Sequence, residues 1–87
     1  MRKKLPPLTW FRAFECSARH LNFTAAAHEL GLTQSAISQQ VRLLEDRFGV
    51  PLFIRLPRGL ALTDTGRRIL PNVTEPLNGL ARVAAAF

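Results

Sequence analysis

Residues 22–49, NFTAAAHELGLTQSAISQQVRLLEDRFG, contain start and stop signals for two consecutive helices. Asn22 is suited to accept a hydrogen bond from a free backbone N–H of a first turn, and Gly31 suits the left-handed residue that ends a helix. Thr33 then offers a second N-cap. After it, apolar residues recur at spacings of four, three and four, which predicts a second helix with one buried face. These residues are Ile37, Val41, Leu44 and Phe48.

The two predicted helices are separated by only a tight turn and are expected to cross closely. Ala26 and Ala27 are small enough to let the second helix lie across the first. We expect Leu30, Leu32 and Ile37 to fill the angle between the helices. Two short helices arranged in this way form a helix-turn-helix, whose second helix can enter the major groove of DNA.

The second helix has a mostly uncharged polar face opposite its apolar residues. Short or planar hydrogen-bonding side chains of this kind can reach base edges in a major groove. A surface helix with a solvated polar face is an equally good interpretation of this helix taken alone. The residues of the face are Gln34, Ser35, Ser38, Gln39 and Arg42.

The composition indicates one small domain with a polyanionic partner. Of 87 residues, 47% are hydrophobic, and 12 Lys and Arg against 6 Asp and Glu give a net charge of +6. Such a charge favours nucleic acid or an anionic membrane surface. No apolar run approaches the roughly 20 residues that span a bilayer. The N-terminus has proline where a signal peptide needs its apolar core, so we expect a cytoplasmic protein.

The sequence contains no recognisable catalytic or metal-binding motif. Cys16 is the only cysteine, which excludes an internal disulfide, and we expect it to pack in the interior. His20 and His28 are eight residues apart and have no convincing ligand partner at helical spacing. We therefore expect no enzyme activity, no metal and no cofactor.

A helix is also predicted before the motif, over residues 9–20, with Thr9 as its N-cap. Trp10 lies off the apolar stripe of this helix, and we expect it to pack on a partner subunit or on a following helix. The basic residues 2–4, which precede this helix, are expected to approach phosphate groups. The predicted inward face comprises Leu8, Phe11, Phe14 and Ala18.

A short β-hairpin is predicted directly after the motif. Residues 52–56 and 60–63 are rich in β-type side chains, and the Pro-Arg-Gly of residues 57–59 predicts the tip between them. A hairpin in this position is a wing, on which Arg55 and Arg58 can contact phosphate or a narrow minor groove. The alternative is a loop whose arginines serve only solubility.

The last predicted helix covers residues 64–87, begins at Thr63 and Asp64, and carries an apolar stripe at heptad spacing. A stripe this long on a small domain is most simply covered by a second copy. Pro71 and Pro76 each remove a helical hydrogen bond, so we expect a bend or a break near them. Because the stripe is unfinished at the last residue, we expect a fragment of a longer protein. The stripe comprises Leu70, Val73, Leu77, Leu80, Ala84 and Phe87.

The order and spacing of several of these residues resemble those in a known protein family. The run from Phe23 to Gly66 is similar to the N-terminal winged helix-turn-helix domain of LysR-type transcriptional regulators, and the resemblance extends over essentially the whole chain. The opening LPPL, followed by FRAFECSARHLNFTAAA, further resembles the branch with the glycine-cleavage and β-lactamase gene activators. The matching elements are Ala26, Ala27, residues 33–38, Leu44, Glu45, Gly49, Leu52, Phe53, Arg55, Leu62, Thr63 and Gly66.

The resemblance implies a bacterial regulator that binds pseudo-palindromic promoter DNA as a dimer or tetramer. It implies a fold that is mainly α with a small β-hairpin. A winged helix-turn-helix would occupy residues 1–63, and a linker helix over residues 64–87 would pair two subunits ahead of an effector domain. Recognition helix 34–48 would enter the major groove, and wing 52–63 would lie on the backbone or in the minor groove.

The same resemblance implies a role for individual residues. Those nearest the bases would be Gln34, Ser35, Ser38 and Gln39, the last of which stands where many members carry arginine. Those near the DNA backbone or minor groove would be Thr24, Thr33, Gln40, Arg42, Arg55 and Arg58. The dimer interface would comprise Trp10, Leu70, Val73, Leu77, Leu80, Ala84 and Phe87.

Sequence-specific binding of double-stranded DNA by a homodimer is the leading hypothesis. A module that docks another protein is the second, and the net charge of +6 together with the Arg-tipped hairpin speaks against it. Sequence-indifferent coating of DNA is the third. The mostly uncharged recognition face speaks against it, since pure phosphate binding favours more Lys and Arg there.

Overall fold

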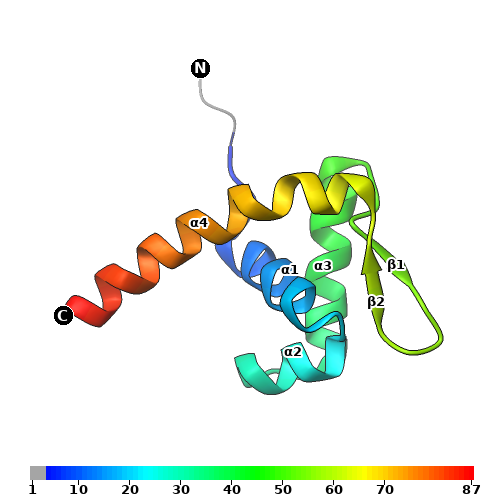
Figure 1. Ribbon diagram of the computed structural model, residues 1–87, viewed down its shortest axis with the longest axis horizontal. Helices are drawn as coiled ribbons and strands as arrows, with labels where there is room; N and C mark the ends of the chain where they lie inside the picture. Colours follow the sequence, from blue (N-terminus) through cyan, green and yellow to red (C-terminus); the bar gives the residue numbers. More distant parts are fainter. Residues whose placement is uncertain (1–3) are drawn as a thin grey trace.

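The computed structural model describes residues 4–87, so the predicted phosphate contacts of Arg2 and Lys3 lie outside the described residues. The first three helices form a cluster, a hairpin lies beside the third, and the last helix passes over the first before it extends away (Figure 1). No helix among residues 4–87 is both long and apolar enough to cross a membrane. The elements are α1 (Leu8–His20), α2 (Phe23–Leu30), α3 (Gln34–Phe48), β1 (Phe53–Arg55), β2 (Leu60–Leu62) and α4 (Asp64–Ala86).

The predicted caps of α2 and α3 are confirmed. The side chain of Asn22 accepts from the backbone N–H of Ala25 at 2.8 Å, and that of Thr33 accepts from Ala36 at 3.1 Å. Gly31 ends α2 with φ +66°, a conformation that glycine adopts without strain. The next residue, Leu32, donates its backbone N–H to the carbonyl of Ala27 at 3.0 Å. This bond fixes the tight turn between the two helices.

The core lies where α1, α2 and α3 meet, with residues of the hairpin and one side chain of α4 added to it. The small residues Ala26 and Ala27 of α2 are buried in this core. Leu30 is partly buried against this core. The largest fully buried side chains are Phe14, Ile37, Leu44, Leu52, Val41, Cys16 and Ser17.

Three side chains predicted to lie in the interior are exposed. Leu32 is 45% exposed because the turn that carries it lies outside both helices. Phe48 is 40% exposed because it is the last residue of α3, where one side of its ring faces Phe11 and the rest is open to solvent. Leu8 is exposed as the first residue of α1.

The start of α1 also differs from the prediction. The helix begins at Leu8, and Pro7 occupies the N-cap position without a side-chain hydrogen bond. Thr9 is therefore inside the helix and is not its cap. Proline suits the start of a helix because it lacks the N–H that would be unpaired there, and its carbonyl still accepts from Trp10 at 3.0 Å.

The hairpin is an antiparallel pair with Phe53 opposite Leu62 and Arg55 opposite Leu60. Its strands are shorter than the predicted ranges 52–56 and 60–63, because Thr63 caps α4 instead of extending β2. The backbone N–H of Leu60 also donates to the carbonyl of Leu21 at 2.9 Å, which attaches the hairpin to the corner between α1 and α2.

The helix α4 is continuous from Asp64 to Ala86 through both Pro71 and Pro76, so a break there was wrong. Figure 1 shows a change of direction along this helix, which is the predicted bend. Each proline leaves the carbonyl four residues earlier without an N–H donor. Those carbonyls belong to Arg67 and Asn72, both exposed, so water can replace the missing donor.

Candidate nucleic-acid interface

The N-terminal half of α3 presents the predicted reading face. Gln34, Ser35 and Gln39 are exposed, and Ser38 is half-buried on the same side of the helix. The hydroxyl of Ser38 donates to the carbonyl of Ser35 at 3.2 Å, whereas the two glutamine amides have no side-chain hydrogen bond within residues 4–87. Both amides are therefore free to donate and accept in a groove of DNA.

The opposite side of α3 holds this face in place. Ile37, Val41 and Leu44 are completely buried, so α3 cannot rotate without exposing its core side chains. Because α3 is fixed in this way, the backbone positions that carry the predicted reading face are defined by the fold of the domain.

A groove of about 260 Å³ lies between the start of α2, the start of α3 and the hairpin. Thr24, Gln34 and Arg55 all line it. The structure thus brings one predicted base-reading residue together with two residues predicted near the DNA backbone, although they come from separate segments of the sequence.

The other residues predicted to contact the DNA backbone differ in how free their side chains are to do so. Arg42 and Arg58 are exposed and have no hydrogen bond or ion pair within the described part of the chain. Gln40 is half-buried. The hydroxyl oxygen of Thr33 accepts the capping bond of α3, which leaves its proton free for an outside acceptor.

Arg55 makes contacts that sequence reasoning missed. The centre of its guanidinium lies 4.9 Å from the centroid of the Phe23 ring, a cation–π distance. Its Nη2 atom lies 3.6 Å from Oε1 of Glu45. Neither partner is near Arg55 in sequence, so spacing alone gave no signal for these contacts.

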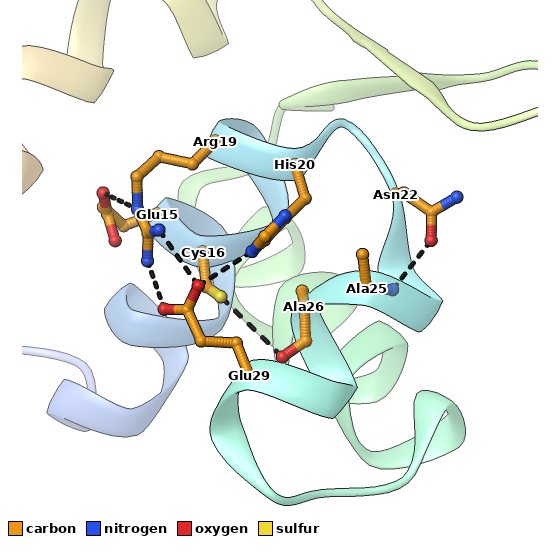
Figure 2. A network of polar contacts seen from close by, with 8 residues as sticks. All are labelled: Glu15, Cys16, Arg19, His20, Asn22, Ala25, Ala26 and Glu29. Carbon is orange, nitrogen blue, oxygen red and sulfur yellow. Dashed lines mark hydrogen bonds and ion pairs between the residues drawn. The ribbon is translucent and has the colours of Figure 1, made fainter.

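A polar network joins α1 to α2 on another part of the surface (Figure 2). Arg19 donates to both carboxylate oxygens of Glu29, at 3.1 and 2.6 Å, and to Glu15 at 2.8 Å. Nε2 of His20 lies 2.8 Å from Glu29. Arg19 therefore links an acid of its own helix to an acid of α2.

The same network contains a grouping that sequence spacing did not reveal. The ligand atoms of Cys16, His20 and Glu29 all lie within 4.8 Å of one another. However, burial raises the pKa of the Cys16 thiol to about 11, and neighbouring Glu29 adds to the rise. Because Arg19 already neutralises Glu29, we describe the grouping as a structural link between α1 and α2.

Acid is expected to weaken this link. Hydrogen bonds from Arg19 and then from His20 lower the pKa of Glu29 from 4.5 to about 2. A lowered carboxyl pKa stabilises the fold above the unfolded value of 4.5, and this stabilisation is lost as the pH falls through about 2. Urea unfolding of the wild type and of Glu29→Gln should therefore show a stability difference at neutral pH that shrinks over this interval. A difference that is independent of pH would contradict the prediction.

The predicted dimer residues fall into two groups. Trp10, Leu70 and Leu77 are partly buried against the core of their own domain, and Val73 is buried in it. Leu80 is 53% exposed, and Ala84 and Phe87 are exposed beyond it. An apolar groove of about 290 Å³ between the chain start, α1 and α4 continues this exposed surface.

The sequence matches a family of bacterial regulators and several of its curated members. The family model described as bacterial regulatory helix-turn-helix protein, lysR family, matches residues 8–67. The chain is 56% identical over 81 residues to the HTH-type transcriptional activator AmpR of Providencia stuartii, covering 93% of this chain and 28% of that protein. It is 48% identical over 75 residues to the glycine cleavage system transcriptional activator of Escherichia coli (strain K12), covering 86% of this chain and 25% of that protein.

A solved structure with bound DNA is also similar. The crystal structure of a CbnR_DBD-DNA complex matches with a TM-score of 0.82 at 30% sequence identity, covering 93% of each chain. The chain spans less than a third of the length of the curated relatives described above.

Proposed function

Because the chain belongs to the lysR family of bacterial regulatory helix-turn-helix proteins, we propose that it is a sequence-specific DNA-binding domain and not an enzyme, in which α3 reads base edges in a major groove. The observation that carries this proposal is the row of exposed and half-buried polar groups on a helix whose other side is buried. The proposed base-reading residues are Gln34, Ser35, Ser38 and Gln39.

Around this face, the wing at residues 52–63 approaches the backbone or the minor groove. Arg58 at the tip is exposed and has no hydrogen bond or ion pair with residues 4–87, which supports this role, as does the place of Arg55 on the groove beside Thr24. The proposed contacts to the DNA backbone or minor groove are Thr24, Thr33, Gln40, Arg42, Arg55 and Arg58.

The proposed ligand is a pseudo-palindromic promoter in the bacterial cytoplasm, bound by a homodimer. In this proposal residues 1–63 bind DNA and residues 64–87 pair the two copies, with exposed Leu80 and Phe87 as the main new contacts. Burial of Val73 in its own domain restricts the interface to the outer side of the stripe. Sedimentation of the chain with and without a palindromic duplex tests the pairing, and monomers in both samples would exclude it.

Fluorescence anisotropy with two labelled duplexes tests base reading. One duplex carries the promoter region upstream of the protein's own gene, and the other is a scrambled sequence of equal length. Gln34→Ala and Gln39→Ala should each weaken promoter binding by about 1–3 kcal/mol where a bidentate base contact is lost, with little change on the scrambled duplex. Arg58→Ala is the matched control, since it should weaken both and reduce the salt slope by about 0.9.

The outcomes separate the competing functions. Equal losses on both duplexes would remove the glutamines from base reading. Equal, salt-sensitive binding of the wild type to both duplexes would favour DNA coating. No binding even at low salt would favour a module that docks another protein.

A further inference from the structure

The carboxylate of Glu45 lies between the recognition helix and the wing. Its Oε2 atom accepts from the backbone N–H of Leu52 at 2.8 Å and from that of Phe53 at 3.2 Å. Its other oxygen, Oε1, faces Arg55 at 3.6 Å. The Glu45 side chain is only 13% exposed, so water competes little for these contacts.

This carboxylate fixes where the wing begins. A sheet of two short strands is marginally stable alone and needs support from a neighbouring element. The N–H groups of Leu52 and Phe53 lie at the start of β1, and both residues are buried. Buried N–H groups require a hydrogen-bond acceptor. Because Glu45 belongs to α3, it supplies that acceptor from the same helix that carries the reading face.

The second oxygen of Glu45 limits the positions of Arg55. The guanidinium has the ring of Phe23 on one side, at 4.9 Å, and Glu45 within ion-pair distance. Arg55 nevertheless remains 43% exposed and lines the groove that it shares with Thr24 and Gln34. A long side chain that is already ordered loses less entropy when it contacts a phosphate.

We propose that Glu45 is a positioning residue for DNA binding, which sets the wing and its Arg55 at a fixed place relative to α3. The inference rests on the proposed role of the wing. Glu45 itself touches no DNA in this proposal, and its effect is transmitted through Leu52, Phe53 and Arg55.

The proposal predicts a change in DNA affinity opposite to the change expected from net charge alone. Removal of one acidic charge from a DNA-binding domain should strengthen binding, since the domain is attracted to phosphate more strongly. If Glu45 positions the wing, Glu45→Gln should weaken binding instead. Glutamine has nearly the same size and keeps one acceptor oxygen, but it loses the charge that faces Arg55.

Asp46 offers a matched control on the same helix. It is exposed and its side chain has no hydrogen bond or ion pair within residues 4–87. Asp46→Asn changes the net charge by the same amount as Glu45→Gln. We expect Asp46→Asn to bind the promoter duplex as tightly as the wild type or more tightly, and Glu45→Gln to bind roughly fivefold to tenfold more weakly.

The salt dependence and a double variant distinguish positioning from general destabilisation. Glu45→Gln should reduce the salt slope by about 0.9, the same loss as in Arg55→Ala. The double variant should bind no more weakly than Arg55→Ala alone, because Glu45→Gln acts on DNA binding through Arg55, which the double variant already lacks. Thermal unfolding followed by circular dichroism verifies that each variant is folded at the temperature of the assay.

Two results would overturn the role of Glu45: promoter affinity of Glu45→Gln equal to that of Asp46→Asn, or fully additive losses with Arg55→Ala. If Glu45→Gln does not fold, Glu45→Asp repeats the test at constant net charge, with Asp46→Glu as its control. In that pair only Glu45→Asp should weaken binding. A wild type that does not prefer the promoter would instead contradict the proposed function itself.

Discussion

Phe14→Ala is expected to lower the free energy of unfolding by about 3–5 kcal/mol. Phe14 is completely buried, and its ring lies 5.5 Å from that of Phe53, so the substitution leaves a cavity between α1 and the wing. In a domain of 87 residues, a loss of this size is a large part of the total stability. Urea unfolding followed by circular dichroism measures it.

Phe48→Ala provides the control, since it removes the same side chain from a site that is 40% exposed. The Phe48 ring contacts that of Phe11 at 6.3 Å between centroids, but water already covers much of it. We expect less than half of the loss seen for Phe14→Ala. Similar losses at the two positions would contradict the described core.

Gly66→Ala is expected to destabilise the protein by about 1–3 kcal/mol, although alanine is the better helix former. A Cβ atom at Gly66 would lie 2.3 Å from the carbonyl oxygen of Leu52 and 3.0 Å from the side chain of Leu62. The carbonyl belongs to the backbone, so it can move away only if the wing moves relative to α4. Thermal unfolding of the variant measures the effect.

The matched substitution on the same helix is Gly79→Ala, which is expected to change the free energy of unfolding in the opposite direction. The nearest atom to a Cβ there is Nη2 of Arg82 at 3.7 Å, an ordinary contact with a flexible side chain. Without a clash, the higher helix propensity of alanine should stabilise the protein by up to about 1 kcal/mol. Destabilisation by both substitutions would show that packing at Gly66 is not the cause.

Local signals in the sequence predicted most of the helical framework. Asn22, Gly31 and Thr33 act on atoms only a few residues away, so their types alone identify the ends of α2 and α3. The buried positions of Ile37, Val41 and Leu44 follow from helical spacing for the same reason. The hairpin was also predicted, but its strands are shorter than expected, because Thr63 caps α4 instead of extending β2.

The incorrect predictions concern places where tertiary geometry decides the outcome. Leu32 and Phe48 have apolar side chains, but the turn and the helix end that carry them lie at the edge of the domain. Of the bend or break expected at Pro71 and Pro76, the break does not occur, because a proline removes one hydrogen bond and the carbonyls of exposed residues can accept from water. None of this information is contained in residue type.

The reading face of the site was predictable, whereas its supports were not. Gln34, Ser35 and Gln39 follow from the periodicity of one helix. The contacts of Arg55 with Phe23 and Glu45 join three separate segments, and those of Arg19 with Glu29 join two helices. Pairs of this kind depend on the packing of the whole domain, which a single sequence does not reveal.

Three junctions of this domain are made by main-chain atoms. Leu32 bonds to Ala27, Leu60 to Leu21, and the N–H of Thr63 to the carbonyl of Leu52, in each case through backbone groups. Such bonds do not depend on which side chains the neighbouring surface carries. The exposed residues of α3 can therefore be exchanged without loss of these three bonds, so that under the proposed function the bases that are read can change while the fold is kept.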